Sequence, residues 1–131
     1  MAETTSTPPH TLSIKVGEVQ TDILMSFGRL NELAGLVSDI NLLPTIDFDL
    51  ATRTAVLAIC LAPRDERGRR TDQDWCIPPE LSVEAASAVL DWAKDHLMDF
   101  FIGRLEQHLV ALKQNDARLT GLGASLSSSQ P

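Results

Sequence analysis

The feature that most constrains this chain is a long stretch without proline, residues 82–112, in which apolar residues recur at helical spacing. Ser82 is suited to cap a helix N-terminus, and Glu84 in the first turn favours the positive end of the helix dipole. A helix over this stretch would be about 46 Å long. Since a domain of 131 residues does not need so long an element, the stretch predicts a long amphipathic helix in a mainly helical protein.

The first half of this helix has an apolar face opposite an acidic one. Helical geometry places the following apolar residues on one face: Ala86, Val89, Leu90, Ala93, Leu97 and Phe100. Asp91, Asp95 and Asp99, the acidic ridge, follow i, i+4 spacing on the opposite side, where like charges are neighbours at a small cost to the helix. The ridge is either a solvated face or a surface for a basic segment. A straight ridge cannot surround a cation, so it predicts no metal site.

The second half of the helix presents a different apolar face. This distal stripe consists of Phe101, Ile102, Leu105, Leu109 and Leu112, and it is rotated by roughly 100° from the first stripe. Gly103 lies at the changeover and costs a helix about 1 kcal/mol relative to alanine. Two interpretations follow: a break at Gly103 that folds the end back onto the core, or an exposed surface for self-association or a helical client.

The residues before the long helix predict an α+β arrangement. Apolar residues alternate on both sides of Gly17-Glu18, which predicts a β-hairpin with a II′ turn over residues 12–25. Ser26 is a suitable N-cap for a first helix reaching Ile40. A second helix is expected to start near Asp47 or Asp49 and to run to Ala62.

The predicted fold class is therefore mainly α (α+β), with an N-terminal β-hairpin followed by three helices, the last long and amphipathic. Residues 1–10 are expected to be a flexible segment and residues 11–113 a single domain. Residues 114–131, rich in glycine and serine towards their end, are expected to be a disordered tail.

Residues 63–74 are the most charge-dense part of the sequence. Arg64, Arg67, Arg69 and Arg70 alternate there with four acidic residues. The segment is either a solvated loop or a docking loop for an acidic neighbour, with the acidic ridge of another copy as the candidate. Such contacts would make a homo-oligomer. Of the two cysteines, Cys60 is expected to be buried, and Cys76 to lie in a loop whose Trp75 and Ile77 pack on the core.

Composition and motifs exclude several classes of function. The net charge of −7 argues against nucleic acid and against an anionic membrane surface. No phosphate loop, catalytic motif or zinc spacing occurs in the sequence, so we predict a non-enzymatic interaction protein without cofactor or metal. A small enzyme or metal-dependent regulator, for example with Cys76 and His96 as a catalytic pair, stays as an alternative. Without a signal-peptide pattern or a run of about 18 apolar residues, a cytosolic location is expected.

Three stretches together resemble a known family. They are residues 12–33, which include Met25-Ser26-Phe27-Gly28-x-Leu30-Asn31-Glu32-Leu33, the apolar helix Ala51–Leu61, and Asp91-Trp92-x-x-Asp95-His96-x-x-Asp99-Phe100-Phe101. Over residues 12–112 the chain resembles the tail assembly chaperones of long-tailed bacteriophages. The resemblance implies an oligomeric protein that binds and solubilises the tape measure protein in the host bacterial cytoplasm and is absent from the mature virion. The alternative is a virion structural subunit, such as a connector or tail completion protein.

Overall fold

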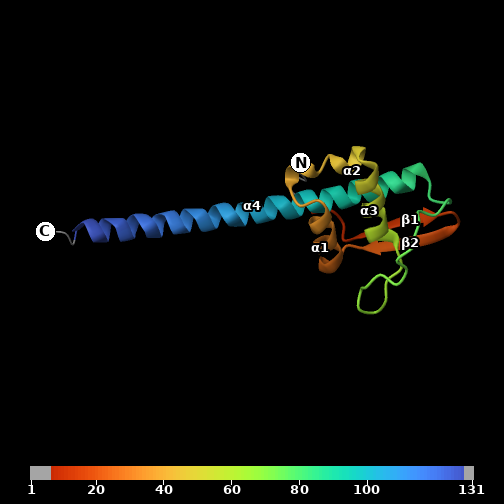
Figure 1. Cartoon of the computed structure of the whole chain (residues 1–131), viewed down its shortest axis with the longest axis horizontal. Helices are drawn as coiled ribbons and strands as arrows, with labels where there is room; N and C mark the ends of the chain where they lie inside the picture. Colours follow the sequence, from red (N-terminus) through yellow and green to blue (C-terminus); the bar gives the residue numbers. More distant parts are fainter. Residues whose placement is uncertain (1–6, 129–131) are drawn as a thin grey trace. The chain divides into compact units, whose positions relative to one another are not determined.

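The computed structural model describes residues 7–128, and the side-chain environments of residues 7–122. The elements, in chain order, are β1 (Thr11–Val16), β2 (Val19–Leu24), α1 (Phe27–Leu36), the 3₁₀ helix η2 (Ile40–Leu42), α2 (Thr45–Phe48), α3 (Leu50–Leu61) and α4 (Val83–Ser128) (Figure 1). The predicted fold class is confirmed, since a hairpin is followed by helices of which the last is long. The short elements η2 and α2 were not predicted.

The two strands form an antiparallel hairpin closed by Gly17 and Glu18, with Val16 opposite Val19. Gly17, the first turn residue, has a φ of +64°. Glu18, the second, does not have a positive φ, since among the described residues only glycines do. A positive φ at the first turn position alone is the II′ geometry, so the predicted turn is confirmed. Ile14 and Ile23 are buried on the inner face. Because a two-stranded sheet is marginal in water, this burial is what stabilises the hairpin.

Helix α1 starts where the sequence predicts and ends earlier. The Ser26 hydroxyl accepts a hydrogen bond from the Arg29 N–H at 3.1 Å, which confirms the N-cap. The predicted continuation to Ile40 is wrong, because the chain leaves the helix at Val37 (φ −112°, ψ 85°). Asp39 then accepts a hydrogen bond from the Asn41 N–H at 2.9 Å and caps η2 instead. The hydrogen bond from the Asn41 N–H to the Asp39 side chain therefore favours a separate 3₁₀ turn over a continued α1.

Helix α3 agrees with its prediction at both ends. Asp49 caps it by accepting a hydrogen bond from the Thr52 N–H at 2.9 Å. The helix ends at Leu61, two residues before Pro63, which has no N–H to continue it. Leu50 is exposed, and α3 packs against α1 and α2 with buried side chains such as Val56 and Cys60.

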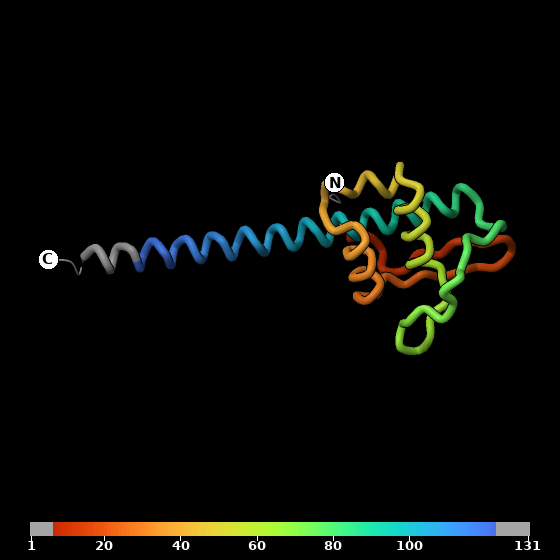
Figure 2. The backbone as a smooth tube through the Cα atoms, viewed as in Figure 1, coloured from red at the N-terminus to blue at the C-terminus, as the bar shows by residue number. Residues whose placement is uncertain are grey.

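The chain divides into two compact units, Met1–Asp99 and Phe100–Pro131. The predicted domain boundary after residue 113 falls inside the second unit. The first unit contains the core, whose most completely buried side chains come from α1, α2, α3, α4 and the segment after α1: Leu33, Val37, Ile46, Val56, Val89 and Leu97. Trp75 is half-buried as predicted, whereas Ile77 is exposed. The backbone that links α3 to α4 loops outward from the rest of the first unit (Figure 2).

Helix α4 is longer than predicted. Its N-cap is confirmed, since the Ser82 hydroxyl accepts a hydrogen bond from the Ala85 N–H at 3.0 Å. The helix has no break at Gly103 and continues to Ser128, so the first of the two interpretations, a break at Gly103, is wrong, and so is the predicted end at Leu112. No proline follows Leu112 before residue 131, and isolated glycines cost a helix only about 1 kcal/mol each. The expected disordered tail is helical as far as Ser128; residues 1–6 and 129–131, also expected to be flexible, lie outside the described part.

The two cysteines differ in their surroundings, which predicts a difference in reactivity. Cys60 is buried in α3 and Cys76 is exposed. Burial raises the pKa of the Cys60 thiol to about 12, and the thiolate is the reactive form. We expect Ellman's reagent to modify Cys76 in the folded protein and Cys60 only after denaturation. Native Cys76→Ser protein should then show no reactive thiol, and rapid reaction of that variant would contradict the burial of Cys60.

The same shift gives a direction for the pH dependence of stability. A raised pKa means that the folded state favours the neutral thiol. The contribution of Cys60 to stability is therefore complete below pH 9.0, the ordinary value for a thiol, and is lost as the pH rises towards about 12.

Candidate functional site

The first part of α4, Val83 to Asp99, is held by its apolar side and exposes its acidic ridge. Val89, Leu90, Ala93 and Leu97 are buried, while Asp91, Asp95 and Asp99 are exposed, as the helical spacing predicts. Asp91 lies 4.0 Å from the ammonium of Lys94, which is paired at 2.9 Å with Asp47 on α2. The hydrogen bond to Asp47 raises the pKa of Lys94. Among the described residues, Asp95 and Asp99 form no ion pair.

Two ring side chains of α4 bind the start of the described chain. The indole N–H of Trp92 donates to the carbonyl oxygen of Pro9 at 2.7 Å, and Nε2 of His96 lies 2.8 Å from the same oxygen. Both side chains are buried, and their rings meet edge to face with centroids 5.1 Å apart. Their burial was not predicted, although their i, i+4 spacing places them on one side of the helix.

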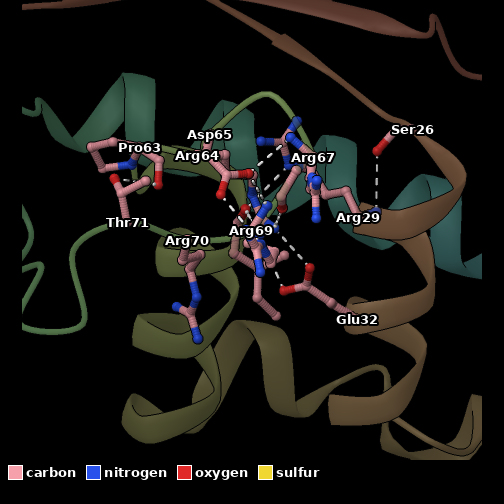
Figure 3. A network of polar contacts seen from close by, with 12 residues as sticks. Ser26, Arg29, Glu32, Pro63, Arg64, Asp65, Arg67, Arg69, Arg70 and Thr71 are labelled. Carbon is pink, nitrogen blue, oxygen red and sulfur yellow. Dashed lines mark hydrogen bonds and ion pairs between the residues drawn. The ribbon is translucent and has the colours of Figure 1, made fainter.

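Arg64 is directed inward, which corrects its predicted role as a contact between subunits. Its guanidinium donates to both carboxylate oxygens of Glu32 on α1, at 2.7 and 3.1 Å. It also donates to the carbonyl oxygen of Ile59 at 2.8 Å and to that of Gly68 at 2.7 Å. Figure 3 shows Arg64 beside Glu32 within the network of polar contacts. Only 13% of the side chain is exposed. The acidic neighbour of Arg64 is therefore Glu32 of the same chain, whose pKa is lowered chiefly by this hydrogen bond.

The rest of residues 63–74, the arginine loop, folds around the carboxylate of Asp65. The carboxylate of Asp65 accepts hydrogen bonds from the N–H groups of Arg67 and Arg69 at 2.9 and 3.0 Å, and from Nε of Arg69 at 3.2 Å. These bonds, the backbone one from Arg69 first, lower the pKa of Asp65. Gly68 permits the tight turn with a φ of +82°. The side chains of Arg67 and Arg70 form no ion pair with any described residue, so they are the loop's available cations.

These loop arginines surround an open cavity together with a residue that the sequence analysis did not single out, Arg29 of α1. The cavity has a volume of about 920 Å³, and it is lined by five arginines (Arg29, Arg64, Arg67, Arg69 and Arg70) with Glu32, Glu66 and several smaller residues. Arg29 donates through Nε to the carbonyl of Ile59 at 3.1 Å and through Nη1 to the carbonyl of Leu24. Burial lowers the pKa of Arg29.

The distal stripe lies in the second unit and is exposed. Ile102, Leu105, Leu109 and Leu112 are 44%, 53%, 51% and 49% exposed, and Phe101 is half-buried. The Phe101 ring meets the Phe100 ring edge to face, with centroids 5.8 Å apart, and the guanidinium of Arg104 lies 5.8 Å from the centre of the Phe100 ring. None of the side chains described in this unit is buried. The stripe is thus an apolar surface on a helix that has no core within its own unit.

Comparison with known proteins gave no relative: no family model, curated protein or solved structure matches the chain.

The described residues contain no cluster of side chains suited to bind a metal ion, and Cys76 and His96 form no hydrogen bond with each other. No three histidine, cysteine or acidic side chains between residues 7 and 122 are grouped to hold a metal ion. The Cys76 thiol donates to the carbonyl of Asp74, whereas the His96 ring bonds to Pro9, so the two members of the alternative catalytic pair have separate partners. No helix in the part of the chain that the structure describes has both the length and the apolar run for a membrane crossing. The distal stripe is the candidate functional surface because its aliphatic side chains are exposed on a helix whose described side chains in the second unit are not buried.

Proposed function

We propose that this chain is a tail assembly chaperone of a long-tailed bacteriophage, which binds the tape measure protein through the distal stripe. The observation that supports the proposal is the exposure of four aliphatic side chains of this stripe, at 44–53%, on a helix without a core of its own. Contiguous exposed apolar area usually marks an interaction surface. The sequence resemblance supplies the identity of the client.

The chemistry of the client fits this surface. A tape measure protein is long, helical and apolar, and two amphipathic helices can bury their apolar faces against each other. Complete burial of an aliphatic side chain contributes about 1.5–3 kcal/mol, whereas association costs several kcal/mol of lost freedom. One stripe therefore gives modest affinity, and a long client needs several copies along its length. The net charge of −7 keeps such a complex soluble.

Co-expression with the tape measure protein of the same phage tests the proposal. The wild-type chain should move that protein into the soluble fraction, and the double variant Phe101→Asp with Leu105→Asp should abolish the effect, because two charges on the stripe prevent apolar contact. The matched control is Phe48→Asp with Leu50→Asp, which places the same charges on exposed apolar residues of the first unit. This control should retain the effect. Equal solubility with and without the chain, or equal loss in both variants, would contradict the proposal.

Purified virions provide a second readout. A chaperone leaves before the particle is complete, so mass spectrometry of virions should not detect the chain. A fixed number of copies per particle would instead favour the structural subunit, such as a connector or tail completion protein.

A further inference from the structure

The arginine cavity is an exception in an acidic chain. Five of the eleven basic residues line it, against two acidic residues, Glu32 and Glu66. The charge of the cavity wall is therefore positive although the net charge of the chain is −7. Cations gathered at this density repel one another unless an anion lies between them.

The five arginines divide into structural and available groups. Arg64 uses both terminal nitrogens on Glu32 and on two carbonyls, and Arg69 is paired with Asp65. Arg67 and Arg70 have no ion-pair partner among the described residues. Arg29 has five N–H donors, of which two bond to backbone carbonyls. Three guanidinium groups, from α1 and from the loop, thus keep free donors at one cavity.

Two buried features indicate a missing acceptor. Arg29 is partly buried and forms hydrogen bonds only to neutral carbonyl groups, with Glu32, which already pairs with Arg64, as the nearby acid; a partly buried cation is stabilised by a further anion. Nε of Arg64 is buried without any hydrogen-bond partner, the only such side-chain atom found in the described residues. An anion in the cavity would offset the charge of Arg29.

We propose that this cavity binds the phosphate group of a small phosphorylated molecule through Arg29, Arg67 and Arg70. A guanidinium fork matches a pair of phosphate oxygens, and the tetrahedral group can accept from several forks in different directions, which a planar carboxylate does less well. Ser26 and Gly28, at the N-terminus of α1, line the same cavity and add the positive end of a helix dipole. The cavity, of about 920 Å³ and open to solvent, has room for an organic part attached to the phosphate. This inference is independent of the proposed function.

Inorganic pyrophosphate is the probe for the test, with the full-length chain at constant ionic strength. Calorimetric titration should show saturable binding to one site per chain, accompanied by a rise in the melting temperature. Arg67→Gln with Arg70→Gln should weaken binding by about tenfold or more per arginine, since bonds to charged groups are the strong ones. The matched control, Arg53→Gln, removes an exposed arginine of α3 that does not line the cavity, and it should bind as the wild type does.

The contrary results are equally specific. Absence of pyrophosphate binding, or the same affinity in the double arginine variant, would overturn the proposal. The acidic ridge of a second copy is the competing occupant. If the chain self-associates, fails to bind pyrophosphate, and becomes monomeric in Asp95→Asn with Asp99→Asn, then the cavity receives carboxylates of another copy and not phosphate.

Discussion

Replacing Leu97 with alanine should lower the free energy of unfolding of the first unit by about 2–5 kcal/mol. Leu97 has no exposed surface and lies on the buried face of α4. The substitution removes three carbon atoms from a close-packed core and leaves a cavity that the neighbouring side chains fill only partly. Since small domains are stable by about 5–15 kcal/mol in total, the loss is a large share. Urea unfolding followed by Trp fluorescence measures it.

The matched control is Leu50→Ala, which deletes the same atoms at an exposed position of α3. Its effect should stay within about 0.5 kcal/mol. Equal destabilisation by the two substitutions would mean that α4 does not pack through the face that Leu97 occupies.

Replacing Gly103 with proline should divide α4 at the start of the second unit. Proline costs about 3 kcal/mol in a helix interior, because it removes an N–H donor and clashes with the preceding turn. The second unit has no buried side chain in its described part, so it has no packing energy with which to offset that cost. We expect a loss of helical circular dichroism at 222 nm, with the unfolding of the first unit little changed.

Gly103→Ala is the opposite substitution at the same position and should increase helicity, since a Cβ there meets no atom within 4 Å and alanine favours the helix by about 1 kcal/mol. If proline and alanine gave the same spectrum, the continuity of α4 through Gly103 would be in error. The proline variant should also lose client solubilisation, because Leu105 to Leu112 would no longer continue the helical face.

Local signals in the sequence were sufficient for the starts of α1, α3 and α4 and for the hairpin turn. Ser26, Asp49 and Ser82 each cap the helix that follows, and Gly17 takes the positive φ that the turn needs. Each of these features depends on a few neighbouring residues. The end of α1 and the 3₁₀ helix were not predicted because the sequence is ambiguous there. Ile40 continues the apolar spacing of α1, while Asp39 can also cap a new turn, as it does in the structure.

Features that depend on distant residues were not predictable from spacing. The charge pattern of the arginine loop does not reveal that Arg64 turns inward, because its partner Glu32 lies 32 residues away in the sequence. Arg29 joins the loop arginines at one cavity only after α1 and α3 have packed. By contrast, the distal stripe follows from helical periodicity alone, and its exposure could be expected once the helix was known to continue past Gly103.

The shared carbonyl of Pro9 has a consequence for the order of events during synthesis. Its two donors, Trp92 and His96, are 83 and 87 residues further along the chain. At about 5–20 residues per second, the N-terminal hairpin leaves the ribosome several seconds before the helix that secures the residues in front of it. During that interval the Pro9 carbonyl lacks both of its ring donors, so the segment in front of β1 is not yet held by α4. The time taken to translate the residues between the hairpin and His96 therefore sets how long this segment stays unattached.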